Sequence, residues 1–165
     1  MAELAAPFDL AMVSLSKGLG APGGSMLAGS TADIGRAALP AHARWGDAPG
    51  RDLAAAAMYA LDHHVTRLAD DHANARRMAA ILARGARIEL DPADVQTNIL
   101  VFRVRTGDPA FPDAHEVVLR AREQGVLVFA FDDRTIRAVT HLDVDAAQCE
   151  HAANVLVACA DKPRR

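Results

Sequence analysis

Hydrophobic residues near the start of the chain occur in short, mostly apolar runs, a pattern more typical of strands than of helices. One run covers Phe8–Ser16, and a second covers Gly24–Gly29 after a glycine-rich turn. We therefore predict a buried strand over the first run and a short strand over the second. Thr31–Ala38 then predicts a short helix, because Asp33 suits its first turn and Pro40 suits its end.

A long helical pattern occupies the middle of the chain. Between Asp52 and Arg84 apolar residues recur at spacings of three and four positions, which places them on one face of a helix. Gly85 follows, and glycine commonly terminates helices. We therefore predict one continuous helix over Asp52–Arg84.

The last third of the chain alternates between strand and helix patterns, which indicates an α+β domain. Ile99–Arg105 predicts a strand, and the apolar runs Val126–Phe131 and Thr135–Val139 predict a hairpin because a short acidic turn joins them. Two helices are expected to begin after Asp113 and Asp145, because each aspartate is followed three residues later by Glu or Gln. The first should run to Gly125 and the second through Ala160.

Composition narrows the class of protein. The 165 residues suffice for one domain with a remnant of another, and 51% of them are hydrophobic while only 4% are aromatic. The formal net charge of −3, with both signs interspersed, gives no indication of nucleic-acid binding. No apolar run reaches the length of a membrane span, and the start lacks a signal-peptide pattern. We therefore expect a cytoplasmic protein without membrane association.

The two cysteines fit that expectation. Cys149 and Cys159 fall on one predicted helix, about 15 Å apart along its axis, so they cannot form a disulfide with each other.

The strongest candidate for chemistry is Lys17, which directly follows the first apolar run. Four glycines lie within the next eight residues, where they allow tight turns and close approach of the backbone to a ligand. A lysine amine presented in this way can form a Schiff base with a carbonyl group. The order of residues does not fit a P-loop, because there the lysine follows the glycines. Taken alone, the pattern favours a solvated surface lysine, because most lysines beside glycine loops are of that kind.

Several blocks of the sequence resemble the low-specificity L-threonine aldolases, a family that uses pyridoxal phosphate. The block around the lysine, Ser16-Lys17-Gly18-Leu19-Gly20-Ala21-Pro22, resembles the cofactor-binding segment of that family. Further matching blocks follow in the same order as in the family: residues 24–29, 58–64, 68–75, 96–99 and 136–144. In these aldolases the lysine lies past the middle of the polypeptide, so the resemblance covers only their C-terminal half.

The resemblance implies an α/β fold, specifically the C-terminal portion of the fold-type-I pyridoxal-phosphate enzymes. Residues 1–50 would be a remnant of the large cofactor-binding domain and carry the lysine. Residues 51–85 would form a long interdomain helix, and residues 86–165 a small C-terminal α+β domain.

The resemblance also implies the site. Lys17 would hold pyridoxal phosphate and be the catalytic lysine, Ser16 would lie beside the cofactor phosphate, and Arg137 would pair with the substrate carboxylate. Each residue also has a simpler interpretation. Lys17 would then be a lysine with no cofactor, Ser16 a polar residue at the end of a strand, and Arg137 a strand arginine that faces solvent. The ring-stacking residue and the partner of the pyridinium nitrogen would lie upstream of this sequence.

The sequence departs from the family at the arginine that helps to hold the cofactor phosphate. That arginine aligns with Pro49, while Arg44 and Arg51 lie nearby but out of register.

A metal site is not expected. His63 and His64 point to different faces of the predicted helix, and His64 and His72 lie about 12 Å apart along it. That separation is too long for a shared ion, since zinc–nitrogen bonds measure about 2.1 Å.

Two hypotheses for function follow from the resemblance. The first is cleavage of L-threonine or L-allo-threonine to glycine and acetaldehyde, an activity of threonine catabolism and glycine formation, with a small amino acid as substrate. The second is a non-catalytic chain that binds a partner, either another copy in a homo-oligomer or a complementary N-terminal half. We expect the chain to be inactive by itself. A related β-eliminating lyase is a third, weaker possibility.

Overall fold

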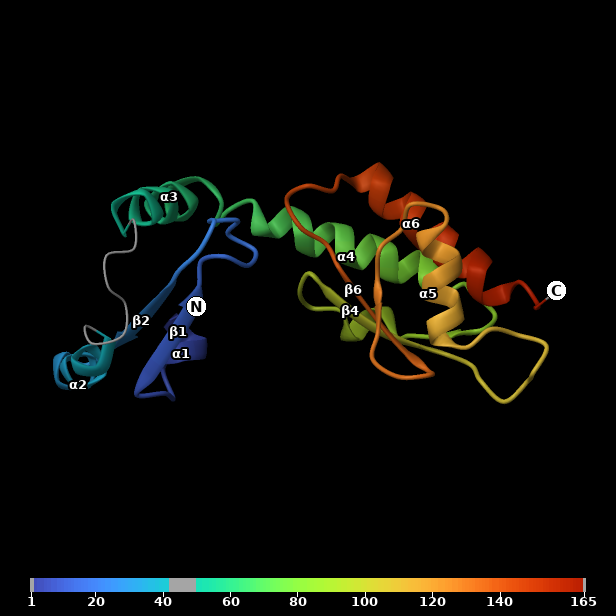
Figure 1. Ribbon diagram of the computed structural model, residues 1–165, viewed down its shortest axis with the longest axis horizontal. Coiled ribbons are helices and arrows are strands. Elements are labelled where there is room, and N and C mark those ends of the chain that lie inside the picture. Colours follow the sequence, from blue (N-terminus) through green and yellow to red (C-terminus); the bar gives the residue numbers. More distant parts are fainter. Residues whose placement is uncertain (1, 42–49, 165) are drawn as a thin grey trace. The chain divides into compact units, whose positions relative to one another are not determined.

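The computed structural model describes residues 2–41 and 50–164 (Figure 1). The chain forms two compact units, Met1–Arg67 and Leu68–Arg165, and each unit has its own antiparallel sheet. Among the described helices, none is long and apolar enough to cross a membrane.

The first unit is built around a two-stranded sheet. After the short helix α1 (Ala2–Ala5), strand β1 (Leu10–Ser14) pairs along its whole length with β2 (Ser25–Gly29). Helices α2 (Thr31–Ala41) and α3 (Gly50–His63) follow. The structure thus confirms both predicted strands and the start of the helix at Thr31, but that helix extends beyond Ala38.

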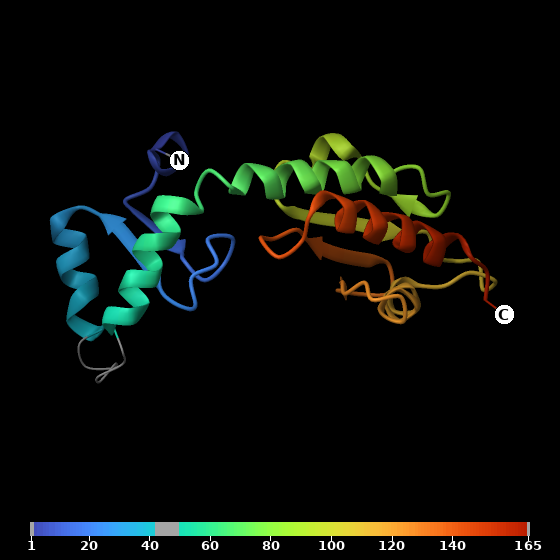
Figure 2. The same ribbon diagram turned by 90° about the horizontal axis from the view of Figure 1, so that it is seen from above.

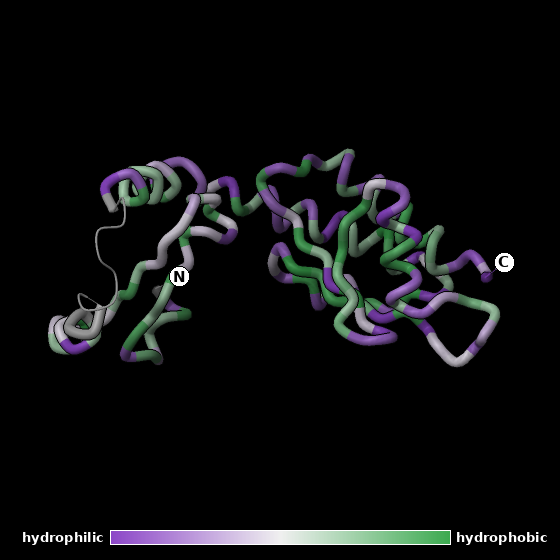
Figure 3. The backbone as a smooth tube through the Cα atoms, viewed as in Figure 1, coloured by the Kyte–Doolittle hydropathy of each residue, from purple (hydrophilic) through white to green (hydrophobic). Residues whose placement is uncertain are grey.

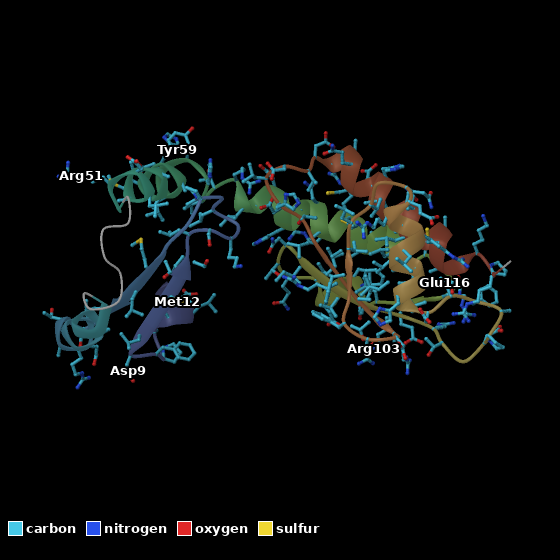
Figure 4. All side chains as sticks on the ribbon, viewed as in Figure 1. Asp9, Met12, Arg51, Tyr59, Arg103 and Glu116 are labelled. Atoms are coloured by element: carbon cyan, nitrogen blue, oxygen red, sulfur yellow. The ribbon has the colours of Figure 1, made fainter. Side chains whose placement is uncertain are left out.

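The predicted burial of the first strand is wrong. Met12 of β1 is 68% exposed, and every residue of β2 is exposed. Figure 4 labels Met12 on β1. A sheet of two strands is too small to bury side chains on both of its faces, and it is marginally stable unless more structure is added.

The predicted continuous helix over Asp52–Arg84 is also wrong. α3 ends at His63, α4 (Leu68–Leu82) begins five residues later, and a turn lies between them (Figure 1). The turn contains Val65 and Thr66, whose β-branched side chains are restricted in a helix. The boundary between the two units falls directly after Arg67, so the predicted interdomain helix is divided between them.

The second unit is an antiparallel sheet covered by helices. Its strands are β3 (Ile88–Glu89), β4 (Ile99–Val104), β5 (Phe129–Ala130) and β6 (Thr135–Val139), arranged in the order β3-β4-β6-β5. Besides α4, its helical elements are the 3-10 turn η1 (Pro92–Asp94), α5 (Ala114–Arg122) and α6 (Ala146–Asp161). α4 and α6 lie side by side (Figure 2).

Alternation along the two central strands produces the core. Leu100, Phe102 and Val104 of β4 are buried, and their neighbours Val101 and Arg103 are exposed. Figure 3 shows hydrophobic stretches along the strands of this unit. The helices complete the core with apolar side chains that include Ala75, Met78, Ala79, Leu82, Val117, Ala121, Ala153 and Leu156.

The predicted helix starts are confirmed. The Asp113 side chain accepts a hydrogen bond from the Glu116 N–H at 2.9 Å. Asp145 and Gln148 form a reciprocal capping box, with bonds of 2.8 and 2.9 Å. Local side-chain chemistry therefore determines where α5 and α6 begin.

The hairpin is present but its first strand is shorter than predicted. Only Phe129–Ala130 of the expected Val126–Phe131 pairs with β6. Val126 instead donates its N–H to the Ala121 carbonyl at the end of α5, which directs the chain away from β6 at that point.

Candidate active site

Lys17 lies on a compact turn that connects β1 to β2. Three backbone hydrogen bonds close this turn: Leu15 N–H to the Gly24 carbonyl at 3.0 Å, Gly20 N–H to the Lys17 carbonyl at 2.9 Å, and Ala21 N–H to the Leu15 carbonyl at 3.0 Å. Gly20 and Gly24 have φ angles of 70° and 103°, a region that favours glycine. The glycine pattern therefore reflects the geometry of this turn.

Some side chains of the turn are buried, and others are exposed. Leu15, Leu19 and Ala21 are buried, whereas Ser16 and Lys17 are exposed. The apolar residues anchor the turn to the first unit, and the lysine amine is left accessible. Access is the first requirement for an amine that must meet a carbonyl compound.

Ser16 lies next to a second hydroxyl group. Its Oγ is 3.4 Å from the Oγ of Ser14, the last residue of β1. An exposed lysine and, on residues just before it in the sequence, two neighbouring hydroxyl groups are the kinds of group that can engage the aldehyde and the phosphate of pyridoxal phosphate.

Two residues that the sequence did not predict hold the turn from outside. The His64 imidazole lies with Nδ1 2.6 Å from the Leu19 carbonyl oxygen, and an Arg67 Nη2–H donates to the Gly18 carbonyl at 3.4 Å. Both residues come from the segment after α3. Since His64 and Leu19 are 45 positions apart, no local pattern in the sequence indicated this contact.

Arg137 lies in the second unit, at the centre of β6. It is paired with Val101 of β4 and with Phe129 of β5, on the sheet face opposite the buried Ile136 and Ala138. Its side chain is half-buried, and among the described residues no hydrogen bond or ion pair engages its guanidinium group. A free guanidinium between apolar neighbours is suited to a planar carboxylate.

The residues around the expected phosphate-binding position are only partly described by the structure. Arg44 and Pro49 lie outside the described residues. Arg51 is exposed in the first turn of α3, where Figure 4 labels it.

Among the described residues, no group of three or more His, Cys, Asp or Glu side chains is placed to hold a metal ion. His63 instead contacts Tyr59, with the ring centroids 4.3 Å apart.

Comparison with known proteins shows the family. A model of the β-eliminating lyase family matches residues 1–105, more than half of the 165-residue chain. The chain therefore belongs to the β-eliminating lyase family.

Curated relatives and solved structures agree with this family. The low specificity L-threonine aldolase of Escherichia coli O157:H7 is 38% identical over 157 residues, which cover 92% of this chain and 43% of that protein. The low-specificity L-threonine aldolase 1 of Arabidopsis thaliana is 30% identical over 144 residues, covering 87% and 40%. A structure from Listeria monocytogenes, assigned as an L-allo-threonine aldolase, has a TM-score of 0.71 at 18% identity and covers 96% of this chain and 45% of that one.

The chain thus spans about two fifths of the length of the curated relatives it matches. A second structural neighbour, from Exiguobacterium and described as an aromatic amino acid beta-eliminating lyase/threonine aldolase, has a TM-score of 0.71 at 18% identity, and the match covers 47% of its chain. These likenesses confirm the predicted mixed α/β class and the partial fold. The division into residues 1–50, 51–85 and 86–165 stays a prediction.

Proposed function

We propose that this chain is the lysine-bearing and C-terminal part of a pyridoxal-phosphate-dependent aldolase that cleaves L-threonine or L-allo-threonine to glycine and acetaldehyde. The observation that carries the proposal is the accessible Lys17 on a glycine turn, inside a sequence block that matches threonine aldolases. The family assignment and the fold of the neighbours support it.

In this proposal three residues bind the cofactor and the substrate. Lys17 supplies the amine that holds the cofactor, and the Ser16 hydroxyl donates a hydrogen bond to its phosphate. Arg137 binds the substrate carboxylate through its guanidinium fork. When bound, pyridoxal phosphate supplies an electron sink for the electron pair released when the Cα–Cβ bond of the amino acid breaks.

Completion of the site requires further structure. The curated relatives contain more than half of their length beyond the matched region. β1 and β2 expose Met12, Val13, Met26 and Leu27 on a sheet of two strands, which has free edges and uncovered apolar side chains. We propose that segments corresponding to the rest of the relatives' fold cover this sheet, and that the active form is a complex or oligomer.

The same exposed sheet favours a second candidate function. A chain of this kind can bind a complementary segment without performing catalysis itself. This candidate predicts complex formation without acetaldehyde release.

The test is an assay for acetaldehyde, coupled to NADH oxidation by alcohol dehydrogenase. The chain is assayed alone and after co-expression with a second polypeptide. This polypeptide is the N-terminal portion of the Escherichia coli relative, the portion that lies outside the match with this chain. We expect release of acetaldehyde from L-threonine by the co-expressed pair only, and loss of the activity in Lys17→Ala. Activity that survives Lys17→Ala refutes the assigned role of Lys17. A stable complex without activity supports the second candidate.

A further inference from the structure

The turn that carries Lys17 cannot satisfy all of its own backbone groups. Its internal hydrogen bonds use the carbonyls of Leu15, Lys17 and Gly24 as acceptors. The carbonyls of Gly18 and Leu19 receive no backbone donor among the described residues. Backbone carbonyls shielded from water need partners, and here the partners come from side chains outside the turn.

Both partners come from the turn between α3 and α4. His64 approaches the Leu19 carbonyl at 2.6 Å and Arg67 the Gly18 carbonyl at 3.4 Å. His64 is itself anchored to α3, since its N–H donates to the Ala60 carbonyl at 2.9 Å. Two neighbouring carbonyls are thus held from one four-residue segment.

The contact between His64 and Leu19 indicates which ring nitrogen of the imidazole carries the hydrogen. A carbonyl oxygen only accepts hydrogen bonds, so Nδ1 of His64 must carry the hydrogen. The ring orientation is supported by Tyr59, whose ring meets the His64 ring edge-on with centroids 5.6 Å apart. His64 is therefore a donor with a fixed direction.

We propose that His64 and Arg67 are positioning residues for Lys17. Glycines flank the lysine on its C-terminal side, and a glycine backbone has more conformational freedom than that of any other residue. The two side chains hold the backbone at Gly18 and at the following Leu19, directly after the lysine. They fix the direction in which the amine leaves the turn, and a reactive group needs such support to be held in its productive geometry.

This inference rests on the proposed function, which makes Lys17 the cofactor lysine. The contact between His64 and the turn can nevertheless be tested without a measurement of catalysis. The first measurement is hydrogen–deuterium exchange of the turn, followed in the peptide that contains Gly20 and Ala21. Peptides from the second unit serve as an internal control for folding. The variants are His64→Leu, which removes the donor, and His64→Asn, whose side-chain N–H lies at the position of Nδ1. The matched control is His63→Leu, because His63 is exposed and contacts Tyr59 but not the turn.

We expect His64→Leu to increase exchange in the turn about fivefold to tenfold, the equivalent of one lost hydrogen bond of about 1 to 1.4 kcal/mol. His64→Asn should retain most of the protection, and His63→Leu should match the wild type. Arg67→Met should increase exchange less than His64→Leu does, because its contact is longer. Unchanged exchange in His64→Leu, or an equal increase in His63→Leu, overturns the proposal.

The second measurement connects the contact to Lys17. The chain has two lysines, Lys17 and Lys162. After reaction with pyridoxal phosphate and reduction with borohydride, peptide mass spectrometry therefore measures the extent of labelling at each lysine separately. We expect His64→Leu to lower the ratio of Lys17 to Lys162 labelling several-fold and His64→Asn to restore it. A ratio unaffected by His64→Leu overturns the positioning role. A wild-type chain that does not favour Lys17 contradicts the proposed function instead, while the exchange experiment still decides whether His64 holds the turn.

Discussion

Thr140 links the sheet of the second unit to α4, and its substitution gives a quantitative test of this packing. The residue is fully buried, and its Oγ1–H donates to the Asp71 carbonyl at 2.7 Å. Its backbone N–H and carbonyl bond to Asn98, at 3.0 and 2.7 Å, so they hold β6 beside β4 whatever the side chain is. Thr140→Val therefore keeps the shape and removes the hydroxyl, with its bond to Asp71 and a longer contact of 3.4 Å to the Asn98 carbonyl, which still accepts the Thr140 N–H.

The expected cost follows from these contacts. The Asp71 carbonyl lies in the first turn of α4, where it also accepts the helical N–H four residues later. It is therefore not left without a partner, and the net loss is that of one ordinary hydrogen bond, about 1 kcal/mol. For a cooperative unit of about 100 residues, this lowers the melting temperature by about 4–8 °C.

Urea unfolding followed by circular dichroism measures this cost. Thr106→Val is the matched control, because Thr106 is exposed and no hydrogen bond engages its hydroxyl among the described residues. We expect the urea midpoint to fall in Thr140→Val at an unchanged slope. In the control, the free energy of unfolding should stay within about 0.5 kcal/mol of wild type. Equal midpoints for the two variants would refute the reasoning.

Further predictions concern the core, the pH dependence and the thiols of the second unit. Leu156→Ala should cost about 2–5 kcal/mol in the same urea experiment, because the side chain is fully buried. A hydrogen bond from Arg164 lowers the pKa of Glu116, so this carboxylate stabilises the folded state above the ordinary glutamate pKa, and the contribution is lost as pH falls through the lowered value. Glu116→Gln should therefore flatten the loss of stability below about pH 5. Burial raises the pKa of the Cys149 and Cys159 thiols, so a disulfide reagent at pH 8 should modify neither until the protein is unfolded.

Features that depend on neighbouring residues were predictable from the sequence. Asp113 and Asp145 mark helix starts because the cap bonds span three residues. The strand Ile99–Val104 was predictable because one of its faces is buried by its own unit, so the sequence alternates in step with the burial.

Other features left no clear signal in the sequence pattern and were not predicted. The helix break at residues 64–67 interrupts a stripe of apolar residues that has no proline or glycine to indicate it. The shortening of β5 follows from the bond between Val126 and Ala121 at the end of α5. β1 is exposed because a sheet of two strands is too small to bury the side chains on both of its faces, whereas an apolar run in the sequence predicts burial.

The candidate site shows the same division. Lys17 and its glycines were identified from one local block, and the structure gives this block a defined turn. His64 attracted attention only as a possible metal ligand, because its contact with Leu19 spans 45 positions. Contacts of this length are set by the tertiary fold and leave no periodic signal in the sequence.

The central claim is that Lys17 is the cofactor lysine, and the most direct measurement is its labelling by pyridoxal phosphate in the purified chain. The label is fixed by borohydride and located by peptide mass spectrometry at increasing cofactor concentration, with Lys17→Ala as the control. We expect saturable labelling of Lys17 at concentrations that leave Lys162 largely unmodified. Equal labelling of Lys17 and Lys162 at every concentration would contradict it.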